Sequence, residues 1–579
     1  MFAACATGED SPLCGFRPPP CRRPLVRMAS GKAGSSSRLL KAVDLPSSWD
    51  SREHGWVTPV RDQSPWGTCW TFASFATLET QLLKSGRGEW DFSEKNMASL
   101  NGFDIYFDDG GNYDMASAYL LRWGGAVMES NDVYRTDSSS WNGNPSVPMR
   151  PALHVQNVVW VPGRQTFTDN DTLKTAIMEY GAVAVSYYHE ETYCTSAGAY
   201  YCNVNKDDNH AVTVVGWDDV YSRVKFKSRY RPPGDGAWLV KNSWGTEYGN
   251  EGYLYISYYD VKFAKADGVV YIPAAEGEDY TAVYGYDKLG VVAVDEASDY
   301  SLVAAAFTSA WNEELAAVGV YALEAPKSYT LSIYTNVQRG ASSPVSGGVL
   351  ARSQSGTIER TGYTTIHLEE PVALADGSNF SVVYAPGGTT HYHCVCMSWS
   401  EYSSCSPQRG NTYFASTNNV SGETVTNWID AVEHPDAPLI ACLKAYTRTT
   451  RAAEDKGAMF SDDGTIALDD LATTNAAAYA QFGETFGAFS DIVGANGLTL
   501  WTSWVVGFNP ADAADRTLNL SIDVSGGVPS LFWTPDLGSQ RAYKIWGRDD
   551  LSGASPWRVV PRESLGETSA KFFKVTVAP

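Results

Sequence analysis

One cysteine stands at the start of a segment with helical periodicity. Cys69 opens the stretch 69–84, in which apolar residues recur at the spacing of one helix face. The N-terminus of a helix stabilises negative charge, so it lowers the pKa of a thiol placed there and favours the thiolate. A thiolate is the nucleophile for acyl transfer. The alternative is a buried structural cysteine, a frequent fate of a free cysteine.

Two polar side chains further along the chain complete a possible catalytic set. His210 opens the apolar run 211–217, so it can face a cleft while the strand anchors in the core. Asn242 ends the run 236–242, and an asparagine oxygen can hold an imidazole in one tautomer. Trp244 is placed to shield that bond from water. Each residue alone is ordinary, but together they supply a nucleophile, a base and an orienting group.

The elements that position these residues divide the chain into four parts. Residues 1–44 include a Pro/Arg-rich stretch and predict an unstructured leader. Residues 45–273 predict an α+β domain, with helices at 69–84 and 173–180 and strands at 182–188, 211–217, 236–242 and 253–259. Residues 280–447 alternate short strands with turn residues and predict an all-β sandwich. After a polar linker, residues 458–579 predict a small C-terminal β-rich module.

Taken together, the three segments resemble the papain family of cysteine peptidases. Residues 45–52 and 57–63 are similar to the mature N-terminus of that family, and Asn242-Ser-Trp244-Gly is a specific family motif. His210 follows Cys69 by 141 residues (210 − 69), inside the roughly 130–150 window of papain-like enzymes. Asn242 lies 173 residues beyond Cys69 (242 − 69), outside that window. The loop 220–235 is the candidate insertion that accounts for the excess.

The resemblance implies a two-lobe papain-like fold, with a cleft between a helical lobe and a β lobe. It also implies hydrolysis of peptide bonds through a Cys69 thioester, with His210 as acid and base and Asn242 as the orienting residue. Gln63, six residues before Cys69 (69 − 63), would bind the oxyanion together with the Cys69 backbone N–H. Protein or peptide substrates would contact four residues along the cleft: Gly110, Gly111, Trp244 and Asn209.

Two features depart from the family pattern. Trp66 stands where the family has a disulfide-forming cysteine, three residues before the nucleophile. Only 44 residues precede Leu45, and they lack the long amphipathic helix of the family's inhibitory propeptide, so we do not expect control by such a propeptide. They also lack the apolar core of a signal peptide, although we expect an extracellular or cell-surface protein.

The predicted sandwich resembles the lectin-like domain that follows the papain-like domain in some secreted bacterial peptidases. The resemblance is carried by residues 284–287, 316–321 and 362–366. No sugar-binding residue is identifiable, so binding of a cell-surface glycan or cell wall and mechanical support of the peptidase are both open. The alternative function for the whole chain is a surface adhesin or carbohydrate-binding protein with an inactive peptidase domain. A transferase that passes the acyl group to an amine is a third.

The other cysteines and histidines suggest structure rather than metal chemistry. Cys194 and Cys202 enclose a short loop before His210, and we expect a disulfide there. Strand alternation would place His391 and His393 on one face, with Cys394 and Cys396 on the other, so no zinc site is predicted. No cofactor is expected. Calcium at four acidic residues near the cleft, Asp104, Asp108, Asp109 and Asp114, is a weak alternative.

Charge and hydropathy exclude two classes of partner. The formal net charge of −22 repels phosphate backbones, so nucleic-acid binding is not expected. No run of 18 apolar residues is present, so no transmembrane segment is predicted.

Overall fold

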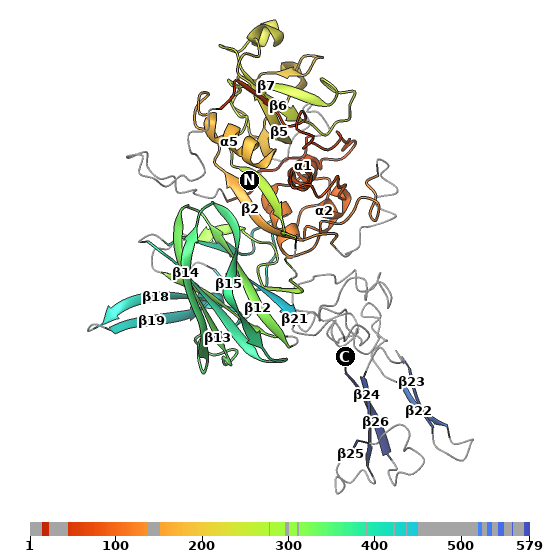
Figure 1. Cartoon of the computed structure of the whole chain (residues 1–579), viewed down its shortest axis with the longest axis vertical. Coiled ribbons are helices and arrows are strands. Elements are labelled where there is room, and N and C mark those ends of the chain that lie inside the picture. Colours follow the sequence, from red (N-terminus) through yellow and green to blue (C-terminus); the bar gives the residue numbers. More distant parts are fainter. Residues whose placement is uncertain are drawn as a thin grey trace.

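The computed structural model describes residues 14–21, 45–135 and 151–449, and five C-terminal strands. Short gaps in the third range fall at 277, 279, 296–299, 310–311, 389–390, 421–422 and 436. Two domains lie one above the other along the longest axis (Figure 1). We call residues 45–273 the first domain and residues 282–449 the second domain.

The described part of the first domain combines four α-helices with one side of a large sheet, which is antiparallel except where residues 199–200 pair parallel with residues 255–256. The helices are α1 (Cys69–Lys84), α2 (Glu94–Leu100), α3 (Tyr113–Leu121) and α5 (Asp171–Tyr180). The strands are β1 (Ser48–Asp50), β2 (Val155–Val161), β3 (Val183–Tyr187), β4 (Ala199–Tyr200), β5 (His210–Asp218), β6 (Ala237–Lys241), β7 (Tyr253–Ser257) and β8 (Gly268–Pro273). The predicted helices at 69–84 and 173–180 and the four predicted strands are confirmed.

Helix α1 is the buried core element of the first domain. It packs against strands β5 and β8, and Trp70, Phe75 and Leu78 have no exposed surface. Each such side chain contributes about 1.5–3 kcal/mol through its burial. Because α1 starts at Cys69 and β5 starts at His210, this packing brings the two predicted catalytic residues to one end of the contact between helix and sheet.

A single sheet runs through both domains. Its strands follow the order β4-β7-β6-β5-β3-β8-β2-β15-β12-β21-β9, and β1 pairs with β5. The domains join where Gly362 and Tyr363 of β15 (Gly362–Leu374) pair with Val159 and Val158 of β2. Gly362 has φ +123°, and a Cβ on it would overlap the Val158 carbonyl oxygen. Only glycine fits this join, which fixes the second domain against the first.

The second domain is a sandwich of two antiparallel sheets. One is the end of the shared sheet, formed by β15, β12 (Glu313–Ala322), β21 (Lys444–Thr449) and β9 (Ala282–Gly285). The other follows the order β14 (Val349–Ile358), β13 (Lys327–Thr335), β16 (Asn379–Pro386), β11 (Leu302–Thr308), β18 (Thr412–Val420) and β19 (Glu423–Asp430). Apolar side chains of both sheets form one core between them.

Smaller sheets complete the described structure. Strands β10 (Ala293–Asp295), β17 (His393–Cys396) and β20 (Ile440–Ala441) form a three-stranded sheet in the second domain. The C-terminal part contains β22 (Asn519–Asp523), β23 (Ser530–Thr534), β24 (Ala542–Arg548), β25 (Arg558–Val559) and β26 (Phe572–Ala578). The predicted fold class is confirmed: an α+β domain is followed by an all-β domain and further strands.

Candidate active site

Cys69 is a fully buried thiol at the first position of α1. The backbone N–H of Ala211, at the start of β5, donates to its sulfur over 3.3 Å. Thr68 at the N-cap makes no side-chain capping bond. The helix N-terminus and the first residues of β5 therefore meet at the sulfur.

His210 is held by Asn242 on one side and Trp244 on its face. The His210 Nε2 and Asn242 Oδ1 atoms are 2.8 Å apart, because β5 and β6 are paired neighbours and Asn242 directly follows β6. The Trp244 indole stacks on the imidazole, with ring centroids 4.4 Å apart and planes at 23°. The Nε2 bond to an acceptor puts the Nε2 proton on His210, which leaves Nδ1 as the basic nitrogen. His210 Nδ1 has no hydrogen-bond partner among the described residues.

Gln63 lies on the other side of the start of α1 and is fixed at both ends of its amide. The amide nitrogen donates to the Trp66 carbonyl over 2.9 Å, and the Ser243 hydroxyl donates to the amide oxygen over 2.6 Å. Ser243 lies between Asn242 and Trp244. The segment that holds the histidine therefore also orients the glutamine.

Residues 14–21, which we call the N-terminal strap, cross the cleft in front of Cys69. The Phe16 N–H donates to the Asn209 carbonyl over 2.8 Å, and the Arg17 N–H donates to the Gly111 carbonyl over 2.9 Å. The Gly111 N–H in turn donates to the Gly15 carbonyl over 2.9 Å. The strap thus runs parallel to Gly111. The prediction that residues 1–44 are an unstructured leader is wrong for these residues, because the cleft supplies the backbone partners that a free segment lacks.

The fit of the strap is close. A Cβ on Gly15 would overlap the Gly67 carbonyl oxygen, and a Cβ on Gly111 would meet the Trp70 indole. The Phe16 side chain is 9% exposed and packs against Tyr113, with ring centroids 5.4 Å apart. Two of the predicted substrate-contacting residues, Gly111 and Asn209, therefore bind a polypeptide backbone in this structure. The neighbouring Gly110, at φ +89°, lies against the Gly15 backbone.

With the N-terminal strap in the cleft, both the Cys69 thiol and the His210 imidazole are uncharged. Burial raises the pKa of the Cys69 thiol to about 12, although backbone N–H groups of Ala211 and Gly15 lower it. Burial also lowers the pKa of His210 to about 3, helped by the neighbouring His189 and opposed by the Asn242 bond. Loss of water disfavours both charged forms. The structure therefore holds a thiol beside a neutral imidazole, and a thiolate–imidazolium pair requires water to return to the cleft.

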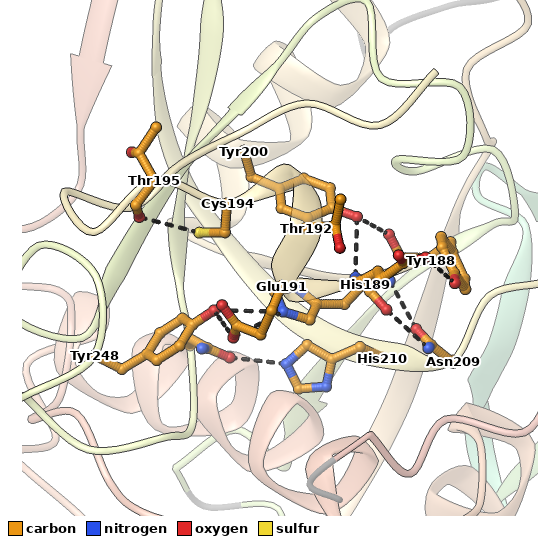
Figure 2. Close-up of polar contacts among 12 residues, drawn as sticks. Tyr188, His189, Glu191, Thr192, Cys194, Thr195, Tyr200, Asn209, His210 and Tyr248 are labelled. Atoms are coloured by element: carbon orange, nitrogen blue, oxygen red, sulfur yellow. Dashed lines mark hydrogen bonds and ion pairs between the residues drawn. The ribbon is translucent and has the colours of Figure 1, made fainter. Parts of the chain in front are cut away.

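A second buried histidine lies behind His210 and was missed from the sequence. His189 Nδ1 is 2.9 Å from the Tyr187 hydroxyl, and its Nε2 lies 3.4 Å from Glu191 and 3.3 Å from the Tyr248 hydroxyl. Figure 2 shows His189 with Glu191 and Tyr248 beside His210. Tyr187, His189 and Glu191 lie within residues 187–191, and Tyr248 comes from a distant loop, so the network forms only when the fold brings that loop to the segment.

His189 also holds two residues of the cleft. Its backbone N–H donates to Asn209 Oδ1 over 2.7 Å, and the Asn209 amide nitrogen donates back to the His189 carbonyl over 3.0 Å. Its ring meets Trp244 edge to face, with centroids 4.7 Å apart. His189 therefore positions both Asn209, whose carbonyl binds the strap, and Trp244, which covers His210.

The predicted Cys194–Cys202 disulfide is not formed, and both residues are free thiols. Each sulfur instead bonds to its own loop. The Cys194 thiol donates to the Thr195 carbonyl over 3.4 Å, and the Val204 N–H donates to the Cys202 sulfur over 3.4 Å. The loop between them is closed by a bond of 3.0 Å from the Thr195 N–H to the Ala199 carbonyl and one of 2.9 Å from the Ala199 N–H to the Thr195 hydroxyl.

The acidic residues near the cleft make structural contacts. Asp108 accepts a bond of 2.8 Å from the Gly67 N–H, and Asp104 accepts one of 2.6 Å from the Ser404 hydroxyl. Within the ranges given above, no group of three or more His, Cys, Asp or Glu residues is arranged to hold a metal ion.

Over the same residues, no helix has the length and apolar character needed to span a membrane.

Comparisons with known proteins agree with this architecture. Residues 45–271 match the model of the papain family cysteine proteases, and residues 283–447 match the model of the lectin-like domain. The chain therefore contains a papain-family cysteine peptidase domain followed by a lectin-like domain, as the sequence motifs predicted.

The relatives with curated names match the first domain. The cathepsin L-like peptidase of Aedes aegypti is 31% identical over 218 residues, which are 37% of this chain and 59% of that protein. Cathepsin L of Sarcophaga peregrina is 30% identical over 238 residues, or 40% of this chain and 65% of that protein. The chain thus spans less than two thirds of the length of these relatives.

A solved structure matches both domains at once. It contains the cysteine protease and lectin-like domains of Cwp84, a surface layer associated protein of Clostridium difficile. The TM-score is 0.58 at 25% identity, covering 70% of this chain and 89% of that chain. A second structure of Cwp84, after propeptide cleavage, gives a TM-score of 0.59 at 25% identity and covers 70% of this chain and all of that one.

Proposed function

We propose that this protein is a cysteine-type peptidase that uses Cys69, His210, Asn242 and Gln63. The Cys69 sulfur attacks the carbonyl carbon of a peptide bond, and the oxyanion accepts bonds from the Gln63 amide and the Cys69 backbone N–H. His210 gives a proton to the leaving amine, and a thioester forms. His210 then takes a proton from water, which attacks the thioester and releases the acid and the thiolate.

The observation that supports this best is the strap itself. Its backbone bonds to Gly111 and Asn209 on either side of Cys69, which is how an extended peptide must lie to bring a carbonyl to a nucleophile. These bonds are to backbone atoms and do not depend on side chains, whereas the close approach of Gly67 favours glycine at the position that Gly15 occupies. A protein or peptide substrate fits this arrangement better than a small molecule does.

Two finer points belong to the same proposal. We place the protein outside the cell or at its surface, as Cwp84 is a surface layer associated protein, and we assign the lectin-like domain a role in holding the peptidase near its substrates. The inactive-adhesin alternative has no specific support, since the Asn242–His210 bond orients the imidazole as catalysis requires.

The test is covalent labelling by an epoxide inhibitor of papain-like enzymes, mapped by peptide mass spectrometry on the full chain carrying Gly15→Ala to open the cleft. We expect label on Cys69 only and cleavage of a mixed peptide library, both lost on adding Cys69→Ala. His210→Ala should abolish cleavage while the protein stays folded. A folded, reduced protein that neither takes up label nor cleaves peptides would refute the proposal.

A further inference from the structure

Two cysteines at the ends of one loop of the lectin-like domain face each other. Cys396 ends strand β17 and has no exposed surface, whereas Cys405 is partly exposed. Both side chains pack in the same apolar cluster. Burial, and then the side-chain interaction with Cys405, raises the pKa of the Cys396 thiol. Both are free thiols here. We call residues 397–404 the cysteine-bounded loop.

The backbone of the cysteine-bounded loop already has a closed shape. Trp399 and Ser403 exchange backbone hydrogen bonds of 2.8 and 2.9 Å across a turn with Glu401 at φ +58°. The Ser398 hydroxyl accepts from the Cys405 N–H over 2.9 Å and donates to the Cys405 carbonyl over 3.0 Å. These bonds keep Cys405 beside the end of β17 without a covalent link, so little rearrangement is needed to form one.

The tip of this loop contacts the cleft of the peptidase domain. The Asp104 N–H donates to the Tyr402 carbonyl over 3.0 Å, and the Tyr402 ring packs on Phe103 with centroids 4.9 Å apart. The Asn112 amide donates to the Tyr402 hydroxyl over 3.1 Å. Asn112 directly follows Gly111, and its oxygen caps α3 through the Asp114 and Met115 N–H groups. The loop therefore supports the edge that binds peptide backbone.

We propose that Cys396 and Cys405 are an oxidation site, and that their disulfide clamps the cysteine-bounded loop against the glycine edge of the cleft. The oxidant is a small-molecule disulfide such as glutathione disulfide. The accessible Cys405 thiolate attacks one sulfur of it and releases one thiolate. The Cys396 sulfur then loses its proton, attacks the Cys405 sulfur and displaces the second glutathione. Two thiols are oxidised, and one small disulfide is reduced to two thiols.

The neighbouring cysteines are less suited to this reaction. Cys394 lies on the same face of the strand as Cys396, but it is buried, so an oxidant reaches it less readily than the partly exposed Cys405. Cys442 is buried, and its thiol donates to the Gly290 carbonyl over 3.3 Å. Cys405 is thus the partner that both touches Cys396 and can be reached by an oxidant.

The experiment treats the full chain with glutathione disulfide, blocks remaining thiols and maps cross-linked peptides without reduction. We expect one peptide pair, joining Cys396 to Cys405. Cys405→Ser should abolish it, while Cys394→Ser, a control on the same strand, should retain it. Recovery of both cysteines as blocked thiols, or a link from either to Cys442, would overturn the assignment.

A second measurement tests the clamp without using activity. The Asp104 amide donates to the loop, so its hydrogen exchange reports how often the loop leaves the cleft. We expect oxidation to slow that exchange roughly tenfold or more, the lower end of what closing a loop by a disulfide supplies. Unchanged exchange in a fully oxidised sample would refute the clamp. In an active preparation, oxidation should lower KM with little change in kcat; this last readout alone rests on the proposed function.

Discussion

Our strongest prediction is that removal of the N-terminal strap from the cleft exposes Cys69 to solvent. A Cβ at position 15 overlaps the backbone of Gly67, which cannot move away easily because the Gly67 N–H is bonded to Asp108. Gly15→Ala should therefore exclude the strap from the cleft. Phe16→Ala should weaken it by removing a buried ring, and Arg17→Ala is the matched control, since the Arg17 side chain is exposed.

The magnitude for Phe16→Ala follows from burial. Burying a phenylalanine side chain is worth about 1.5–3 kcal/mol. At about 1.4 kcal/mol for each factor of ten, a loss of 2 kcal/mol opens the strap roughly 30-fold more often. The strap's three backbone bonds contribute about 0.5–1.5 kcal/mol each, and ordering each strap residue costs about 1–2 kcal/mol, so the aromatic ring decides whether the strap stays closed.

The assay is the rate of Cys69 alkylation by iodoacetamide at pH 7, read by peptide mass spectrometry. In the closed state the pKa of Cys69 is about 12, so the thiolate is scarce and the wild-type protein reacts slowly. Re-entry of water lowers that pKa toward its usual range, and His210 becomes able to accept the proton. We expect Phe16→Ala to react roughly 30-fold faster, by the burial argument above, and Gly15→Ala faster still. Equal rates for wild type, Gly15→Ala and Arg17→Ala would refute the reasoning.

Four further predictions concern residues of the cleft and of the join between the two domains. Asn242→Ala frees the His210 ring and should lower kcat on the order of 10²-fold without unfolding, measured on a peptide substrate in a Gly15→Ala background. Burial lowers the pKa of His189, so this ring is neutral at the alkaline limb of the kcat/KM profile, and His189→Gln should leave that limb in place while KM rises through weaker support of Asn209 and Trp244; a limb that moves to higher pH would contradict this. Gly362→Ala should destabilise the chain by about 1–3 kcal/mol or more in urea unfolding, because it strains a positive φ and meets the Val158 carbonyl. Asn112→Asp keeps the cap of α3 but loses the donors to the Arg17 carbonyl and the Tyr402 hydroxyl, so it should speed Cys69 alkylation, whereas Asn112→Ala also loses the cap, which costs about 1 kcal/mol.

The sequence pattern was sufficient to predict a helix or strand whose residues alone determine its conformation. The helix from Cys69 and the strands from His210 and before Asn242 follow from periodicity and residue type, and the family motif linked them. The sequence could not reveal the strap, since a short Pro-flanked segment takes its conformation from partners such as Gly111 and Asn209 that are far away in the chain. The pairing of β2 with β15 could not be predicted either, because these strands are also far apart in the chain.

Asn112 explains why these separate features act on one site. Its amide nitrogen donates both to the Arg17 carbonyl of the strap and to the Tyr402 hydroxyl of the lectin-like domain, and its oxygen caps α3. A side chain with so many fixed partners has little freedom, so a movement of Tyr402 must displace the Asn112 side chain and change its bond to the strap. When the strap leaves the cleft, the Asn112 amide nitrogen becomes available to donate to a substrate carbonyl. The lectin-like domain is therefore part of the wall of the cleft, which gives a physical reason for one sheet to run through both domains.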